Sequence, residues 1–167
     1  MDVLWAPWRM DYILNPKPGT CILCLSGHGE DDEERLVLYR GHKAFVIMNK
    51  FPYSNGHLMV APLRHVADLT DLSQEENMEI TWLLQQSTRI VRHCCRPEGV
   101  NIGLNLGEAA GAGVREHLHV HLVPRWNGDA SFMTTICQVR VIPEHLAATR
   151  AVLLPHFAAL PEGSCIV

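Results

Sequence analysis

The sequence predicts an α+β fold, an antiparallel sheet of about five strands with one long helix and a C-terminal helix. Short apolar runs separated by tight turns come first, a long stretch with helical periodicity follows them, and further strand-like runs come after it. Strands joined by short turns pair antiparallel. A chain of 167 residues is long enough for one domain with a substantial core.

The first strands are expected on both sides of a turn-rich region near residue 50. Residues 36–39 and 44–48 are apolar runs separated by turn-compatible residues, which suits a hairpin, and residues 57–61 follow a second turn. Three strands joined this closely predict one half of the sheet.

The long helix is expected to begin after Ser73 and to run to about Cys95. Ser73 and Glu76 have the spacing of a capping box, in which each side chain accepts a hydrogen bond from the other residue's backbone amide. Apolar residues then recur at helical spacing, and Pro97 with Gly99 ends the helix. Such a helix should cover one face of the sheet.

Two more strands are expected at 100–106 and 117–123, on either side of a glycine- and alanine-rich loop at 107–113. Beyond Pro124, which should close the second of them, residues 139–142 suit a short strand and residues 144–154 a terminal helix. This helix completes the predicted elements.

We expect a single domain over residues 1–167. Within it, residues 1–35 form an aromatic lead-in, residues 36–125 the core and residues 126–167 a C-terminal extension.

Composition narrows the classes of partner. The formal net charge of −4 gives no reason to expect a nucleic acid held by bulk electrostatics, so a polyanionic ligand has to be captured locally. No run approaches the roughly 18 apolar residues of a membrane span, and the N-terminal segment lacks the apolar centre of a secretory signal. We therefore expect no membrane partner, a cytoplasmic location and six reduced cysteines.

Three histidines alternate with apolar residues in the stretch 117–123. Alternate residues of a strand share a face, so His117, His119 and His121 should line one side. One histidine alone would suit an ordinary surface position, but three in alternation favour chemistry. Imidazole is partly neutral at cellular pH and can act as nucleophile, acid or ligand. Neighbours on one face lie about 6.5–7 Å apart, so a division into ligand and nucleophile fits better than one shared metal.

The loop at 107–113 precedes these histidines and has few side chains. Its backbone N–H groups can therefore approach phosphate oxygens, as in an anion-binding nest. Small residues also form ordinary turns, but beside the histidine row the loop favours a phosphate ligand.

Five stretches together resemble the histidine-triad (HIT) superfamily. NIGLN at 101–105 and HLHVHLVPR at 117–125 resemble its signature, and the segment at 46–65 resembles its nucleotide-pocket hairpin. The segments at 4–13 and 124–133 are similar to a bacterial branch of diadenosine tetraphosphate phosphorylases and hydrolases.

The resemblance implies a nucleotide-binding enzyme that cleaves the phosphoanhydride of diadenosine polyphosphates. His119 would be the nucleophile and become nucleotidylated, with His121 and His57 acting on the phosphate. Phosphate as acceptor makes the enzyme a phosphorylase, that is an ATP adenylyltransferase, and water makes it a hydrolase; both stay open.

Three other functions remain as alternatives: hydrolysis of adenylyl sulfate, hydrolysis of nucleoside phosphoramidates, and non-catalytic nucleotide binding. The loop is longer than in the phosphoramidase branch, and Arg115 and Glu116 precede the histidines, which argues against phosphoramidase as the main activity. No organic cofactor is expected, and family membership would imply a homodimer.

Substrate contacts follow from the same resemblance. Asn49 matches a ribose-contacting position, Asn105 and the amides near the histidines would donate to phosphate, and apolar strand residues would border the base, although plain core packing explains the apolar residues equally well. The complete candidate set is Asn49, Asn105, Gly111, Ala112, Gly113, Val114, Arg115, Phe45, Ile47 and Leu58.

Cys21 and Cys24 have the spacing with which two thiolates hold one tetrahedral ion, usually Zn²⁺. A pair is half a site, and free thiols are the alternative. The resemblance implies His65 and His117 as the other half, which would close a structural zinc site.

Overall fold

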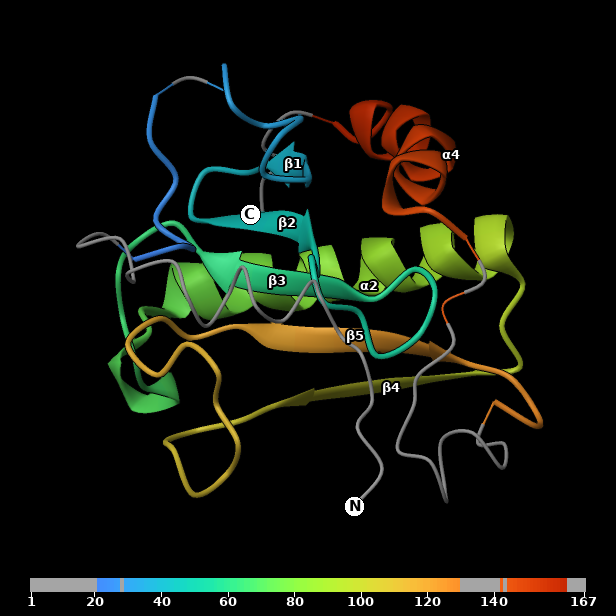
Figure 1. Cartoon of the computed structure of the whole chain (residues 1–167). Helices are drawn as coiled ribbons and strands as arrows, with labels where there is room; N and C mark the ends of the chain where they lie inside the picture. The colour runs from blue at the N-terminus through green and yellow to red at the C-terminus, as the bar shows by residue number, and fades with distance from the viewer. Residues whose placement is uncertain (1–20, 28, 130–141, 143, 162–167) are drawn as a thin grey trace.

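A five-stranded antiparallel sheet with the order β1-β2-β3-β5-β4 forms the centre of the fold (Figure 1). The strands are β1 (Val37–Arg40), β2 (Ala44–Met48), β3 (Leu58–Pro62), β4 (Gly99–Leu104) and β5 (Val120–Arg125). The computed structural model describes residues 21–27, 29–129, 142 and 144–161. The lead-in up to residue 20 and nearly all of the strand expected at 139–142 lie outside these residues.

Helix α2 (Gln74–Cys95) runs along one face of the sheet (Figure 1) and follows the short 3-10 helix η1 (Leu69–Asp71). The capping box is present, since the Ser73 hydroxyl accepts from the Glu76 amide and the Glu76 carboxylate accepts from the Ser73 amide. The main core lies between α2 and the sheet and includes Val46, Val60, Leu83, Val91, Val120 and Leu122. The predicted α+β class and the long helix are confirmed.

A second, smaller cluster lies on the opposite sheet face, where Phe45, Ile47 and Ala61 pack with Leu23. Successive strand residues point to opposite faces, so these side chains alternate with those of the main core. Leu58 belongs to the main core on the α2 side. It therefore does not lie with Phe45 and Ile47, and we leave it out of the proposed base pocket.

Strand β5 begins and ends later than expected. The Leu118 amide donates to the Val66 carbonyl instead of joining a ladder, so regular pairing begins only at Val120. At the other end Pro124 lies inside the strand. The Arg125 carbonyl accepts a hydrogen bond from the Glu98 amide, on the side of β4. Successive residues of a strand direct their backbone polar groups to opposite neighbours, so the Pro124 nitrogen faces the side of β3. The pairing of β3 with β5 has already ended at Leu122. No ladder bond is lost there.

Helix α4 (Leu146–Ala158) packs against α2 and β1 and extends past the expected end at residue 154. Pro155 has no amide hydrogen to donate, yet the helix continues through it to Ala158. Phe157, fully buried in the main core, follows this proline and stabilises the last turn.

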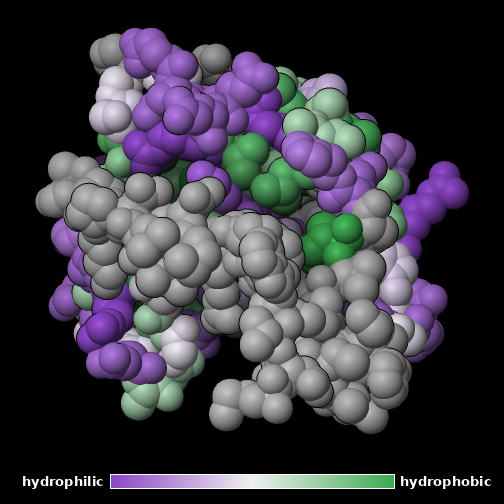
Figure 2. Space-filling model, viewed as in Figure 1, coloured by the Kyte–Doolittle hydropathy of each residue, from purple (hydrophilic) through white to green (hydrophobic). Residues whose placement is uncertain are grey.

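The described surface carries a mixture of hydrophilic and hydrophobic residues on the face seen in Figure 2. Within the described part of the chain, the helices are all too short or too polar to cross a membrane.

Candidate functional site

The three histidines of the row are placed at the start of β5 and do not form a solvent-facing strip. His117 and His119 precede the strand and are almost completely buried, and His121 is half-buried on it. The rings of His119 and His121 lie 4.9 Å apart between centroids, and the buried ring of His57, just before β3, lies 5.1 Å from His121. Met59 pairs with His121 across the ladder, so β3 and β5 hold these rings on one sheet face.

A backbone carbonyl fixes the tautomer of the His119 ring. Its Nδ1 lies 2.8 Å from the carbonyl oxygen of His117, which can only accept, so Nδ1 carries the hydrogen. The other ring nitrogen, Nε2, then keeps its lone pair. A buried imidazole prepared in this way is a competent nucleophile.

His57 and His121 are fixed in the opposite sense. The Tyr53 amide donates to His57 Nδ1 at 3.0 Å, and the Asn49 carboxamide nitrogen, also a donor, lies 3.4 Å from the same atom. His57 therefore carries its hydrogen on Nε2 and donates to His121 Nδ1 at 3.0 Å. His121 in turn presents an Nε2–H group.

Burial, with a smaller contribution from the neighbouring His119, lowers the pKa of His121 to about 4. His121 is therefore neutral at cellular pH, which the hydrogen-bond chain from Tyr53 requires. His57 and His121 together can therefore donate one N–H group to an anion while both rings stay neutral.

Tyr53 is a site residue that the sequence reasoning missed. Besides donating its amide, it places its ring over His57 and His121, with centroid distances of 4.6 and 5.6 Å. A tyrosine in a turn-rich segment carries no periodic pattern, and only the fold brings it over β5.

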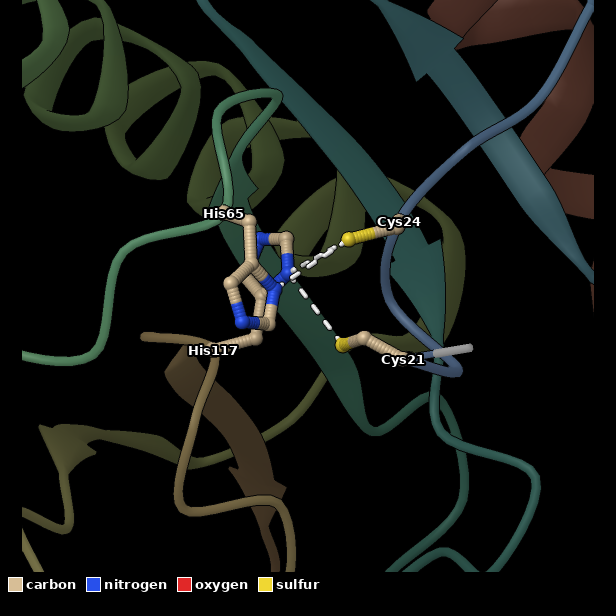
Figure 3. A group of neighbouring side chains, drawn as sticks. All are labelled: Cys21, Cys24, His65 and His117. Atoms are coloured by element: carbon tan, nitrogen blue, oxygen red, sulfur yellow. Dashed lines mark hydrogen bonds between the residues drawn. The ribbon is translucent and has the colours of Figure 1, made fainter. Parts of the chain in front are cut away.

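The four proposed zinc ligands lie together at the other end of the histidine row. In Figure 3 the side chains of Cys21, Cys24, His65 and His117 point toward one another, and one ligand atom from each lies within 4.8 Å of all the others. Cys21 Sγ lies 3.4 Å from His117 Nδ1, and Cys24 Sγ lies 3.3 Å from His65 Nδ1.

These distances fit a tetrahedral zinc site. Zn–S bonds of about 2.3 Å and Zn–N bonds of about 2.0 Å give sulfur–nitrogen edges of about 3.5 Å. His117 Nε2 donates to the Pro62 carbonyl at 2.8 Å, which leaves Nδ1 as the ligand atom and supplies the outer hydrogen bond typical of metal-binding histidines. The Leu23 amide also donates to Cys21 Sγ, at 3.4 Å.

Burial, and next the neighbouring Cys21, raise the pKa of the Cys24 thiol. A cation bound between the two sulfur atoms would offset this shift, because it stabilises the thiolate form of its ligands.

The glycine-rich loop supplies fewer amides than the sequence suggested. The Gly111 amide donates to the Glu108 carbonyl and the Ala112 amide to the Gly107 carbonyl, so both are used in turns of the loop itself. Within the described residues, the amides at 113–115 make no such backbone bond. Among the loop amides, the expected phosphate donors are therefore those of Gly113, Val114 and Arg115, in addition to the Asn105 side chain.

The remaining candidates differ in burial and in their contacts. Phe45 and Ile47 are buried in the smaller cluster, against which Val114 packs. Asn49 accepts from the Phe51 amide through Oδ1 at 2.9 Å. Asn105 follows β4 by one residue and is half-buried. The Arg115 guanidinium pairs with Glu108 at 2.8 Å in an exposed position.

Comparison with known proteins adds an independent finding. Residues 30–128 match the family model described as the HIT domain. A Mycobacterium tuberculosis protein named AP-4-A phosphorylase is 42% identical, over 95% of this chain and 85% of that protein.

Solved structures agree with this match. The crystal structure of a Zn-bound histidine triad family protein from Mycobacterium smegmatis is 31% identical and has a TM-score of 0.61, covering 74% of this chain and 84% of that one. A hypothetical histidine triad nucleotide-binding protein from Sulfolobus tokodaii, 22% identical, shares the fold with a TM-score of 0.64 over 83% of this chain and 92% of its own.

Proposed function

The chain belongs to the HIT family, and from this premise we propose that it cleaves diadenosine polyphosphates through a nucleotidyl group on His119. The observation that carries the proposal is the complementary protonation of two adjacent rings. His119 presents a lone pair, and His121, beside it, presents an N–H group. A displacement at phosphorus needs both a nucleophile and a donor for the oxygens that gain charge.

In the first step His119 Nε2 attacks the α-phosphorus of diadenosine tetraphosphate. A nitrogen–phosphorus bond forms, the phosphoanhydride bond breaks, and its electron pair leaves on the oxygen of ATP. The ring then carries a positive charge, which the His117 carbonyl stabilises through the Nδ1–H it already accepts. His121 Nε2–H and the amides at 113–115 stabilise the phosphoryl oxygens.

In the second step an acceptor oxygen attacks the same phosphorus, and the electron pair of the nitrogen–phosphorus bond returns to His119 Nε2. Inorganic phosphate gives ADP, and water gives AMP. The 42% identity to a protein named AP-4-A phosphorylase supports phosphate as the acceptor.

Product analysis tests this proposal. Diadenosine tetraphosphate is incubated with and without inorganic phosphate, and the nucleotides are separated and quantified. We expect ADP and ATP in equal amounts, dependent on phosphate. AMP plus ATP at the same rate without phosphate would assign water instead, and no cleavage of either kind would contradict the proposal.

A single-turnover experiment tests the intermediate. Substrate labelled in the α-phosphate is mixed with excess enzyme without phosphate, quenched in alkali and digested. We expect an acid-labile label on the peptide that contains His119. Cleavage without any labelled protein would indicate direct displacement.

We propose that zinc occupies the cluster of Cys21, Cys24, His65 and His117 as a structural ion. Bound zinc would hold residues 21–24 against the segment that leads into β5. All four positions are filled by protein ligands, which is typical of structural sites. Elemental analysis of protein purified without added metal should give about one zinc per chain.

We also propose a homodimer that forms through β4. This strand is an edge of the sheet and half-buried or exposed along its length, with Ile102 49% exposed. Exposed edge strands pair readily with a second copy. Light scattering should give twice the chain mass, and Ile102→Glu should shift it toward the monomer.

A further inference from the structure

The turn between β2 and β3, at residues 49–57, carries both Tyr53 and His57. Its internal bonds include His57 N–H to the Ser54 carbonyl at 3.2 Å and Asn49 N–H to the His57 carbonyl at 3.0 Å. The distance from the Tyr53 amide to His57 Nδ1 depends on the shape of this turn. Whatever holds the turn from outside therefore also holds the proton arrangement of His57 and His121.

One outside contact comes from the C-terminal helix. Figure 1 shows the β2–β3 turn beside the segment that leads into α4, and three polar side chains join them. The Asn55 carboxamide donates to the Glu144 carboxylate at 3.2 Å, and the Thr149 hydroxyl donates to the same Glu144 oxygen at 2.5 Å. The Thr149 hydroxyl also lies 3.1 Å from Asn55 Oδ1, and its one hydrogen, shared between the two acceptors, lies closer to Glu144.

The Glu144 cluster, formed by Asn55, Glu144 and Thr149, is attached to the core through α4. Thr149 is 1% exposed, and the buried side chains of Leu153 and Phe157 attach the same helix to the main core. Glu144 stands directly before His145, the N-cap residue of α4. The cluster therefore connects the turn to a rigid element.

The turn is also confined at Gly56. Gly56 has a φ of +72°, which favours glycine, and a Cβ there would lie 3.3 Å from Cys95 Sγ and 3.5 Å from Pro124. The turn is thus close to α2 and β5 at Gly56 and bonded to Glu144 at Asn55.

We infer that Glu144 is a positioning residue for the catalytic histidines: through Asn55 and Thr149 it holds the turn that aims the Tyr53 amide at His57 Nδ1. The chain of contacts runs from Glu144 to Asn55, through the turn to Tyr53, and then through His57 to His121. This assigns a function in catalysis to the C-terminal helix. The kinetic part of the inference rests on the proposed function, whereas the protonation part does not.

Asn55→Asp tests the inference, because it places a second carboxylate against Glu144 where a donor stood. Like charges in contact should move the turn and separate the Tyr53 amide from His57. We expect kcat to fall by roughly tenfold to a hundredfold with a smaller change in KM, since small misplacements near the reacting groups cost about this much. Asn77→Asp, on the exposed surface of α2, is the matched control and should retain wild-type kcat.

Rescue separates positioning from general damage. Adding Glu144→Gln to Asn55→Asp exchanges donor and acceptor, so the introduced amide donates to the introduced carboxylate. We expect the double variant to recover most of kcat, whereas Glu144→Gln alone should not exceed wild type. A double variant no better than Asn55→Asp would overturn the inference.

Nitrogen NMR of the histidine rings, recorded on the zinc-loaded full chain without nucleotide, provides the readout that is independent of activity. His57 should show a protonated Nε2 and an unprotonated Nδ1 in the wild type, a mixture in Asn55→Asp and the wild-type pattern in the double variant. An unchanged pattern in Asn55→Asp would overturn the inference.

Thr149→Val keeps the shape of a buried side chain and removes the hydroxyl, and it serves if Asn55→Asp fails to fold. It should shift the same ring signals in the same direction, and unchanged signals would again overturn the inference. A wild type with the expected ring signals that cleaves no diadenosine polyphosphate would refute the proposed function and leave the positioning intact.

Discussion

At the His117 end of the histidine row the backbone supplies acceptors, whereas at the His121 end it supplies a donor. The Pro62 carbonyl accepts from His117, and the His117 carbonyl accepts from His119. The Tyr53 amide instead donates to His57, which donates to His121. The same side chain is thereby prepared for opposite tasks within a few residues.

The difference shows how a fold sets the chemistry of imidazole. A carbonyl binds the hydrogen at one ring nitrogen and leaves a lone pair at the other, which suits a metal ligand or a nucleophile. An amide occupies the lone pair and leaves a hydrogen at the far nitrogen, which suits a donor to phosphate. Substitutions at the two ends of the histidine row should therefore have different effects.

The largest effect is expected at His119, where the two ends meet. His119→Asn removes the proposed nucleophile, and kcat should fall by at least about a thousandfold. Binding of a non-hydrolysable dinucleotide, measured by calorimetry, should change little, because the other pocket residues remain. An active His119→Asn enzyme would contradict the assignment.

Substitutions at the His117 end, which includes the proposed zinc cluster, should cause loss of the metal and lower the stability of the fold. Cys24→Ser removes one proposed zinc ligand, and we expect the zinc content to fall well below one per chain, the melting temperature to drop, and kcat to fall by roughly tenfold to a hundredfold. Cys94→Ser, a half-buried cysteine of α2 outside the cluster, should keep its zinc. Equal zinc contents in the two variants would remove Cys24 from the site.

Substitutions at the His121 end should lower kcat and leave the zinc content unchanged. His57→Asn breaks the chain from Tyr53 to His121, so the hydrogen of His121 is no longer confined to Nε2. We expect kcat to fall by roughly tenfold to a hundredfold with zinc content unchanged. His42→Asn, an exposed histidine between β1 and β2, is the control. Loss of zinc in His57→Asn would mean that the two ends are not separate.

The sequence predicted what depends on local pattern. The capping box of Ser73 and Glu76 requires only neighbouring residues, and it agrees with the structure. Resemblance to a family supplied His65 and His117 as partners of the cysteine pair, which spacing alone did not give, and the structure brings the four side chains together.

The sequence did not predict features that depend on distant contacts. Asn55 and Thr149 meet across 94 residues, and no periodicity connects them. The use of the Gly111 and Ala112 amides inside the loop depends on turn geometry that small residues leave open. Strand β5 begins later than expected because the Leu118 amide bonds to the Val66 carbonyl outside the sheet.

The smallest expected effect concerns the stability of the protein in acid, and it tests whether His121 is neutral in the folded state. His121 faces His57, His119 and Tyr53, and its burial among them lowers its pKa to about 4. Unfolding returns it to the ordinary value near 6.5, so between these pH values the unfolded chain binds more protons than the folded one. The stability that depends on neutral His121 is therefore complete above pH 6.5 and is lost as the pH falls toward 4.

Between pH 8 and pH 5 this loss should amount to about 2 kcal/mol of unfolding free energy. His121→Asn removes the titrating group, so its unfolding free energy should fall less than that of the wild type over the same interval, by about that amount. Denaturant unfolding of both proteins at pH 8 and pH 5 measures the difference, and the values at pH 8 account for the packing change of the substitution itself. Equal losses in the two proteins would mean that His121 is not held neutral in the folded state. Its ring would then be charged when it donates to a phosphate.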